Sequence, residues 1–325
     1  MREEMTDAAW LREKPRVGIS TCLLGERVRY DGQHKWDRYL TDTVGRFVEW
    51  VPVCPEVECG LPVPREAMRL VGDPESPRLV TSRTHADMTE RMLEFSQRRV
   101  QELEKENLCG FIFKSGSPTS GMTRVKVYDE SGMPQKVGTG VFARAFMEHF
   151  PLVPVEDDGR LHDALLRENF IERIFCLKSY RDCVADRTVE ALIDFHAQHK
   201  LQLMAHSPSM LTEMGRLVAQ PKALAPEELF GSYERLLMDC LRAMCTPGTN
   251  ANVLMHMMGF FKDELTSDEK QELLDVIDRY RREMVPLVVP LALLQHYVRK
   301  YPKPYLAGQS YLNPHPIELK LRNHA

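Results

Sequence analysis

Three cysteines near the start of the chain constrain its fold most, because each stands where an apolar run breaks into a turn. Residues 17–20 are typical of a short buried strand, and Cys22 follows them. Residues 51–53 have the same pattern, with Cys54 at their exit and Cys59 one loop further on. In an open α/β sheet the exits of parallel strands meet at one crevice. These loops can therefore bring thiols side by side.

Three thiolates around one point would form an incomplete metal site. A structural zinc site uses four ligands, whereas an iron–sulfur cluster held by three cysteines keeps one iron open for a substrate. The competing interpretation is that these cysteines are small apolar core residues, because free cysteine is often buried. The spacing alone leaves both open. We interpret the other five as core or incidental residues, because they lie in apolar or helical surroundings: Cys109, Cys176, Cys183, Cys240 and Cys245.

Composition excludes several classes of protein. A chain of 325 residues suits two domains. The formal net charge of −4 gives no bulk electrostatic reason to expect nucleic acid. No apolar run is long enough to cross a membrane, and residues 1–5 carry acids and lead into no apolar stretch, so we expect no signal peptide. Eight cysteines without a secretory signal favour the reducing cytoplasm.

The first half of the chain alternates strand and helix patterns. We predict strands at residues 17–20, 51–53, 110–113 and 125–128, and a long helix over residues 87–107. This order indicates an α/β domain over residues 14–154, with a small, mostly parallel sheet and flanking helices. The Pro- and acid-rich run at residues 151–159 is expected to be the linker.

Strand patterns stop after this run. We predict an all-α domain over residues 160–325 with five or six helices, covering residues 163–182, 187–205, 250–265, 267–282 and 290–301, with another that begins at Pro226.

Three motifs in the first half resemble the thiouracil desulfurase family. They are Cys-Leu-Leu-Gly-Glu-Arg-Val-Arg-Tyr-Asp-Gly at residues 22–32, Cys-Pro-Glu-Val-Glu-Cys-Gly-Leu-Pro-Val-Pro-Arg at residues 54–65 and Lys-Ser-Gly-Ser-Pro-Thr-Ser-Gly at residues 114–121. The helical half resembles the domain often fused behind this one. The segments that carry this resemblance are those around His196 and His206, and residues 286–301. Such fusions resemble bacterial desulfidases that remove sulfur from 4-thiouridine in tRNA.

The resemblance implies a [4Fe–4S] cluster held by three cysteines, with the substrate sulfur bound at the open fourth iron. Water then replaces the sulfur without net redox change. Thiolates are the usual ligands of such a cluster, and a soft iron suits a soft sulfur. A carboxylate is needed to activate the water. Glu56 lies between two proposed ligands, so we predict it to be the base, with Asp31 and Glu58 as the next candidates.

This sequence departs from the family at one position, because many members carry a cysteine where this chain has Ser120. Serine is a poor cluster ligand, so either the third thiolate comes from elsewhere or the cluster is absent. We predict the metal ligands to be Cys22, Cys54 and Cys59. Ser117 and Ser120 then become catalytic hydroxyls near the substrate or the sulfurs. The Ser-Gly-Ser-Pro-Thr-Ser-Gly run also predicts a nest of backbone N–H groups suited to an anion.

Charged residues near the motifs are candidates for substrate binding. Arg27, Arg29, Asp31 and Lys35 follow the first cysteine, and Lys114 follows a buried strand pattern. A solvated loop explains the first four equally well.

In the helical half, basic residues interleaved with tyrosine suit phosphate contacts and base stacking. The candidates are Arg281, Arg282, Arg299 and Lys300, followed by the basic end at residues 320–324. His196, His199 and His206 lie near one helical face, where a metal, a structural role or RNA contact all remain open.

The sequence therefore predicts a cytoplasmic iron–sulfur desulfidase that acts on 4-thiouridine in tRNA. One alternative is a desulfurase of free thiouracil or thiouridine, whose helical half serves oligomerisation or regulation. Another is a non-catalytic RNA-binding or stress adaptor that has lost its cluster. The sequence leaves the oligomeric state open.

Overall fold

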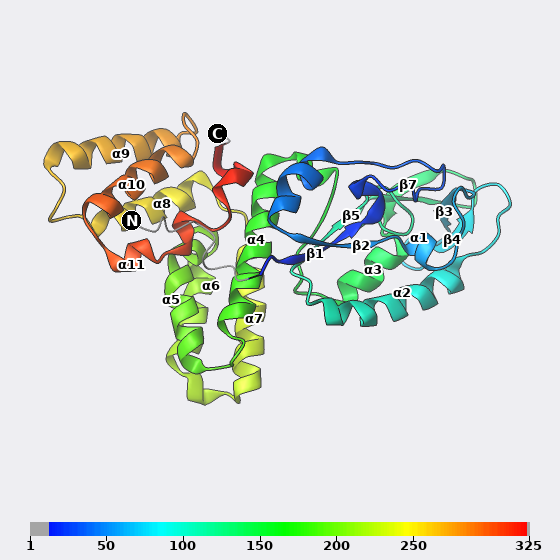
Figure 1. Cartoon of the computed structure of the whole chain (residues 1–325), viewed down its shortest axis with the longest axis horizontal. Helices are drawn as coiled ribbons and strands as arrows, with labels where there is room; N and C mark the ends of the chain where they lie inside the picture. The colour runs from blue at the N-terminus through cyan, green and yellow to red at the C-terminus, as the bar shows by residue number, and fades with distance from the viewer. Residues whose placement is uncertain (1–12, 324–325) are drawn as a thin grey trace, which may run out of the picture. The chain divides into compact units, whose positions relative to one another are not determined.

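The computed structural model describes residues 13–323, which form two compact units at residues 13–166 and 167–323 (Figure 1). The expectation about residues 1–5, and His324 at the basic end, lie outside the described residues. The first unit is α/β and the second is all-helical. The predicted fold class is therefore confirmed.

The first unit is built on a four-stranded parallel sheet. Its strands stand in the order β2-β1-β5-β8. Their bounds are β1 (Arg16–Ser20), β2 (Glu49–Val53), β5 (Gly110–Phe113) and β8 (Val155–Asp157). The inner strands β1 and β5 are buried almost throughout, as expected for strands of a parallel sheet that is covered on both faces.

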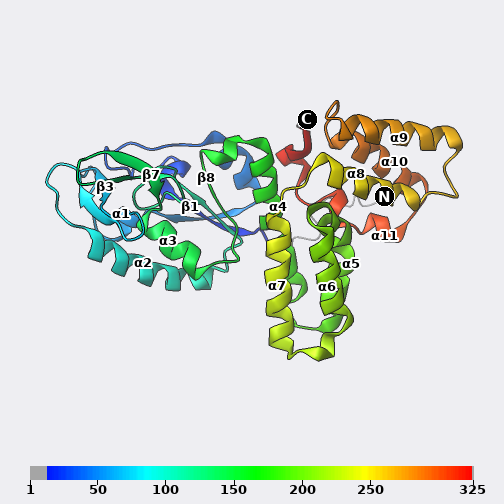
Figure 2. The same ribbon diagram turned by 180° about the vertical axis from the view of Figure 1, so that it is seen from behind.

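The strand order reverses beside β1, because β2 pairs on one side of it and β5 on the other. Two helices, α2 (Thr89–Leu103) and α3 (Val141–His149), lie between β2 and β8 in the chain and pack against each other. Figures 1 and 2 both show them side by side along the sheet. A reversal of this kind opens a crevice at the carboxyl ends of the strands, where ligands bind in open α/β sheets.

Aromatic rings fill the core between this sheet and its helices. Phe111 stacks on Phe113 at a centroid distance of 4.3 Å, and Phe142 and Phe146 of α3 pack against Phe111. Gly18 of β1 leaves room for this packing, because a Cβ atom there would overlap the Phe111 ring. Aromatic packing therefore fixes the strand that leads to Cys22.

A second, mixed sheet lies in the same unit. Its order is β4-β3-β6-β7, from β3 (Met68–Val71), β4 (Arg78–Thr81), β6 (Val125–Tyr128) and β7 (Pro134–Gly138). The strand predicted at residues 125–128 therefore exists but belongs to this sheet. Val125 and Val127 are buried while Lys126 between them is exposed. Such alternation fits a sheet with one solvated face, unlike the fully buried β5.

The predicted linker at residues 151–159 contains the edge strand β8, which pairs with β5. Val153 is buried in the hydrophobic core of the first unit, so this run belongs to that unit despite its prolines and acids. The two compact units divide after Leu166.

The second unit contains more helices than the sequence predicted. Their bounds are α4 (Ala164–Cys183), α5 (Val189–His206), α6 (Pro208–Ala219), α7 (Pro226–Arg242), α8 (Pro247–Gly259), α9 (Ser267–Arg281), α10 (Val288–Lys300) and α11 (Pro304–Ala307). Figure 2 shows α5, α6 and α7 side by side, and all three pack pairwise. Helix α6 was not predicted from the sequence, although Pro208 at its first position is a favourable start for a helix. Within residues 13–323, no helix has the length and apolar character needed to cross a membrane.

The three histidines singled out in the sequence, His196, His199 and His206, have structural partners in this unit. His199 stacks on Phe195 at a centroid distance of 3.8 Å, and His196 shares a 3.0 Å hydrogen bond with the Tyr233 hydroxyl. His206 is buried with Nε2 3.5 Å from a Glu172 carboxylate oxygen. That carboxylate holds the pKa of His206 well above its usual value, despite the opposing effect of burial, which is the largest single influence. These contacts favour the structural interpretation over metal or RNA contact.

The glycine in β1 gives a test of the packing beneath the predicted cysteine loops. We expect Gly18→Ala to lower the free energy of unfolding of the first unit by about 1–3 kcal/mol, because the added methyl overpacks the Phe111 ring. The same change at Gly231 in α7, where a Cβ atom would meet open space, should stabilise its helix by up to about 1 kcal/mol. Calorimetric unfolding of both variants measures this. A Gly18→Ala protein as stable as the parent would contradict the packing account.

Candidate active site

A cavity of about 390 Å³ lies at the carboxyl ends of the parallel strands. Cys22 follows β1, Cys54 follows β2, and Ser117 and Ser120 follow β5, and all four line this cavity. The convergence of Cys22 and Cys54 expected from the sequence is therefore present in the fold.

Hydrogen bonds between the strand ends hold these loops in place. The Ser20 hydroxyl at the end of β1 accepts a hydrogen bond from the Lys114 amide, at 2.9 Å. Asp158, just after β8, accepts one from the Ser115 amide at 2.7 Å. The other oxygen of Asp158 lies 2.9 Å from the Lys114 ammonium. The loop after β5 is therefore fixed to both neighbouring strands.

The two cavity thiols are largely removed from water, with exposed fractions of 8% for Cys22 and 9% for Cys54. Burial raises the pKa of the Cys22 thiol to about 11, although Arg29 and Lys114 oppose this. Burial also raises the pKa of the Cys54 thiol to about 12, and the nearby Glu56 carboxylate adds to the effect. Both thiols are therefore protonated at neutral pH unless a cation replaces the proton.

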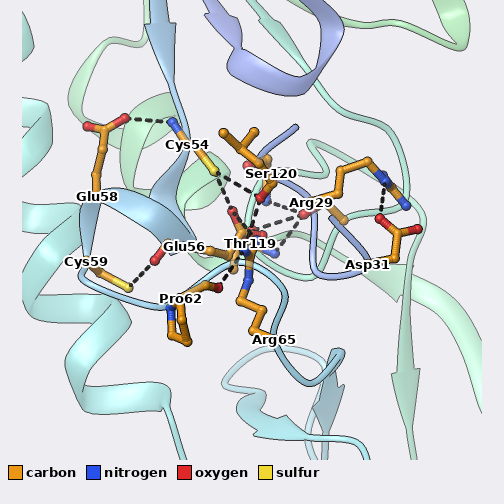
Figure 3. Close-up of polar contacts among 12 residues, drawn as sticks. Arg29, Asp31, Cys54, Glu56, Glu58, Cys59, Pro62, Arg65, Thr119 and Ser120 are labelled. Carbon is orange, nitrogen blue, oxygen red and sulfur yellow. Dashed lines mark hydrogen bonds and ion pairs between the residues drawn. The ribbon is translucent and has the colours of Figure 1, made fainter. Parts of the chain in front are cut away.

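Glu56 is a half-buried carboxylate in the wall of the same cavity. Its Oε1 accepts a 2.7 Å hydrogen bond from the Thr119 hydroxyl, and its Oε2 lies 3.5 Å from the Cys54 sulfur and 3.8 Å from the Arg65 guanidinium (Figure 3). These contacts fix the carboxylate from two sides, and Glu56 lines the cavity, where a water molecule could reach it. A fixed carboxylate in a cavity wall can accept a proton from a group bound there.

Cys59 does not line the cavity. Residues Pro55–Glu58 form the single helical turn α1 between Cys54 and Cys59. At 100° per residue, such a turn places residues five apart roughly 140° from each other around its axis. The Cys59 thiol accordingly donates to the Glu56 carbonyl at 3.2 Å, whereas the Cys54 thiol faces the Glu56 carboxylate (Figure 3). The sequence did not predict this turn.

The thiols of the first unit can be compared with the ligands that the iron–sulfur cluster implied by the motifs would need. The buried thiols of Cys22 and Cys54 line one cavity. The Cys59 thiol lies at the other end of α1. Glu56 and Arg65 are among the charged groups that act on both Cys54 and Cys59. Within residues 13–323, no three His, Cys, Asp or Glu side chains are already grouped as metal ligands. The residues fit the cluster in kind, provided that the Cys59 side chain turns away from the Glu56 carbonyl.

Glu58, one of the alternative bases, has a structural role. Its Oε1 accepts a 2.6 Å hydrogen bond from the Cys54 amide, and its Oε2 lies 2.8 Å from Arg99 of α2. It does not line the cavity.

The serines of the loop after β5 organise that loop. Ser117 Oγ accepts hydrogen bonds from the amides of Thr119 and Ser120, at 3.3 and 3.1 Å. Those amides are therefore already engaged, so the predicted anion nest does not present them to a ligand. Ser117 and Ser120 still line the cavity and can contact a substrate there.

The charged residues after Cys22 divide into two groups. Arg29 and Lys35 line the cavity, whereas Arg27 and Asp31 are exposed and do not. Asp31 instead lies 3.6 Å from Arg29.

Two further cations line the cavity, Lys114 and Arg65. Lys114 lines the cavity as predicted, but its ammonium is paired with Asp158. Arg65 was not identified from the sequence. It donates to the Val28 carbonyl at 2.9 Å and borders Glu56, and its place at the end of the second motif was the available signal.

The basic residues predicted to contact RNA do not form one patch. Lys300 at the end of α10 is 2.8 Å from Glu269 near the start of α9, so the two helices run antiparallel. Arg281 and Arg282 therefore lie at the opposite end of this pair from Arg299 and Lys300, about 20 Å away along a helix of this length. Arg282 is also paired with Asp278 at 2.8 Å. All four side chains are exposed.

Comparisons with known proteins assign both halves of the chain. Residues 17–158 match the 2-thiouracil desulfurase family, and residues 200–316 match a protein family of unknown function, DUF1722. The uncharacterized protein YbgA of Escherichia coli K12 is 34% identical over 134 residues, which cover 41% of this chain and 79% of YbgA.

A solved structure, the [4Fe-4S]-dependent thiouracil desulfidase TudS, is 27% identical. It covers 46% of this chain and 94% of its own, with a TM-score of 0.39. The order of the matched families agrees with the motifs and with the two compact units described above. The chain therefore belongs to the 2-thiouracil desulfurase family of C–S-cleaving enzymes, with a DUF1722 domain after the desulfurase domain.

Proposed function

We propose that this chain removes sulfur from a thiolated uracil by hydrolysis, and that its substrate is 4-thiouridine in tRNA. One observation carries the proposal: two buried thiols and the Glu56 carboxylate open on the same cavity. The family match supports the reaction class.

We propose Cys22, Cys54 and Cys59 as the ligands of a [4Fe–4S] cluster. The fourth cysteine of the first unit, Cys109, directly precedes β5 and therefore lies at the opposite edge of the sheet from the cavity. Cys59 is thus the nearest further thiol along the chain to Cys54. When bound, the cluster supplies an open iron, a soft Lewis acid that suits a thiocarbonyl sulfur.

The side chains around the cavity supply the remaining chemistry. Glu56 takes a proton from the water that attacks the thiocarbonyl carbon, while Thr119 and Arg65 hold its two oxygens. The carbon–sulfur bond then breaks, sulfur leaves as hydrosulfide, and oxygen from water becomes the new carbonyl. The carbon keeps its oxidation state, so no external electron donor is needed.

The alternative substrate is free thiouracil or its nucleoside. It is favoured by the separation of the basic residues on α9 and α10, which leaves no single RNA-binding patch there. Under the tRNA proposal, the two ends of this helix pair contact separate phosphates of a large RNA.

The cluster ligands can be identified by iron content. We expect Cys22→Ser, Cys54→Ser and Cys59→Ser each to remove most of the bound iron and the activity, because serine oxygen is a poor ligand for iron–sulfur irons. Cys109→Ser, the matched control in the same unit, should keep both. Iron analysis and visible absorption of anaerobically purified protein measure the result. If Cys59→Ser keeps its full iron content and Ser120→Ala loses iron, then Cys59 is not the third cluster ligand and Ser120 takes that role.

The proposed base can be tested without disturbing the thiols. Glu56→Gln keeps the acceptor for the Thr119 hydroxyl but cannot take a proton, so turnover should fall about 10²-fold or more while iron content stays normal. Glu58→Gln, a change of the same kind outside the cavity, should leave turnover within a few-fold of the parent. Near-normal turnover in Glu56→Gln would show that another group is the base.

The size of the substrate can be tested with the full chain. We expect kcat/KM for thiolated tRNA to exceed that for 4-thiouridine nucleoside, and tRNA binding to weaken steeply as salt rises. Removing both exposed charges in Arg281→Ala/Arg299→Ala should reduce the salt dependence and leave iron content unchanged. Steady-state kinetics on both substrates and gel-shift titrations at several salt concentrations provide the measurement. Equal kcat/KM on nucleoside and tRNA would favour the free-base alternative.

A further inference from the structure

A second cavity, of about 410 Å³, opens beside the first in the same unit and has a basic lining. Four cationic residues line it, namely Arg124, Lys126, Lys136 and Arg160, which we call the basic groove. Three carboxylates act on Arg160: Glu156, which pairs with it, Asp157, which also lines the cavity, and Asp163. The four cations outnumber these three carboxylates, although the chain as a whole is slightly acidic.

Two of these cations are held directly opposite each other in a β-ladder. Lys126 of β6 faces Lys136 of β7 in the antiparallel register. Both side chains are exposed, and neither forms an ion pair with any residue in the described part of the chain. Like charges opposite each other destabilise a ladder. This pair therefore costs the fold stability, a cost that a bound anion would offset.

The other two cations are held by the backbone and by a buried acid. Arg124 has a left-handed backbone with a φ of 54°, which is unfavourable for a residue with a Cβ atom and is often found at functional sites. Arg124 directly precedes β6 and lines the same cavity as Lys126. Arg160 is fixed by the buried Glu156, with Nε 2.6 Å from the carboxylate. Its amide also donates to Asp157 at 2.8 Å.

The basic groove and the first cavity share one loop. Ser115 and Gly116, directly after β5, line both cavities. In a nucleotide, one sugar separates the base from its phosphate. A base in the first cavity would therefore carry its phosphate into the neighbouring groove across this loop.

We propose that the basic groove binds the phosphate of the nucleotide whose uracil base occupies the first cavity. The desulfurase unit then selects a nucleotide over a free base by itself, without the basic residues of α9 and α10. The proposal rests on the proposed function only in placing a uracil in the first cavity.

Equilibrium binding to the full-length, anaerobically purified protein tests this without turnover. The probes are uridine and uridine 5′-monophosphate. We expect the monophosphate to bind at least tenfold more tightly than uridine at low salt, with the difference shrinking as salt rises. The variant Lys126→Gln/Lys136→Gln should lose most of this difference while its affinity for uridine stays the same. Lys105→Gln, an exposed lysine before β5 at the other edge of the sheet, should bind like the parent.

Thermal unfolding controls for misfolding in the double variant. Removing the opposed charges should leave its melting temperature unchanged or raised, because the repulsion between the two strands is gone. Equal affinity of the parent for uridine and its monophosphate would overturn the proposal. Full discrimination retained in the double variant would also overturn it.

Octauridylate distinguishes the two sources of phosphate. If the groove serves RNA, octauridylate should bind more tightly than the monophosphate, with a steeper dependence on salt. If it serves free nucleotides, the two should bind alike, and both results support the groove. If the protein binds the monophosphate more tightly than uridine but does not desulfurate, the proposed function alone is refuted. If it desulfurates but binds the two ligands equally, the phosphate-binding role of the basic groove alone is refuted.

Discussion

The parallel pairing of β1, β2 and β5, with the strand order reversed beside β1, is the constraint on which the site depends. Ser20 stands opposite Val53 in the β1–β2 register, so both strands end at the same level and their next residues enter one crevice. The Lys114 amide, bonded to Ser20 Oγ, brings the loop after β5 to that level. A slip of one residue would turn every buried side chain of a strand to the other face. The packing that fixes the register therefore also places the thiols.

The two cavities of the first unit differ in how their charges are paired, which suggests a division of roles. Around the first cavity, Lys114 is paired with Asp158 and Arg29 lies near Asp31. A wall whose charges are paired in this way suits a neutral heterocycle. In the basic groove, Lys126 faces another lysine and has no acidic partner among the described residues. That arrangement suits a phosphate.

Local sequence patterns were enough to predict the α/β and all-α halves and the strand exits after which Cys22 and Cys54 stand. The sequence did not predict which strands that are distant in the chain pair with each other. Residues 125–128 have a strand pattern, but nothing local shows which of two sheets they join. Residues 155–157 have the prolines and acids of a linker around them, yet they pair with β5. The turn between Cys54 and Cys59 could not be predicted, because four residues between two cysteines can form a loop or a helical turn. Here Pro55 and the Glu58 contact to the Cys54 amide favour the turn.

The central claim is that the cavity between the strand ends replaces sulfur with oxygen from water, without electron transfer. A single turnover of 4-thiouridine in ¹⁸O-labelled water, with no added reductant, tests it most directly. The account predicts one labelled oxygen in each uridine formed and one hydrosulfide released with it. Unlabelled uridine, or turnover only when a reductant is supplied, would contradict it.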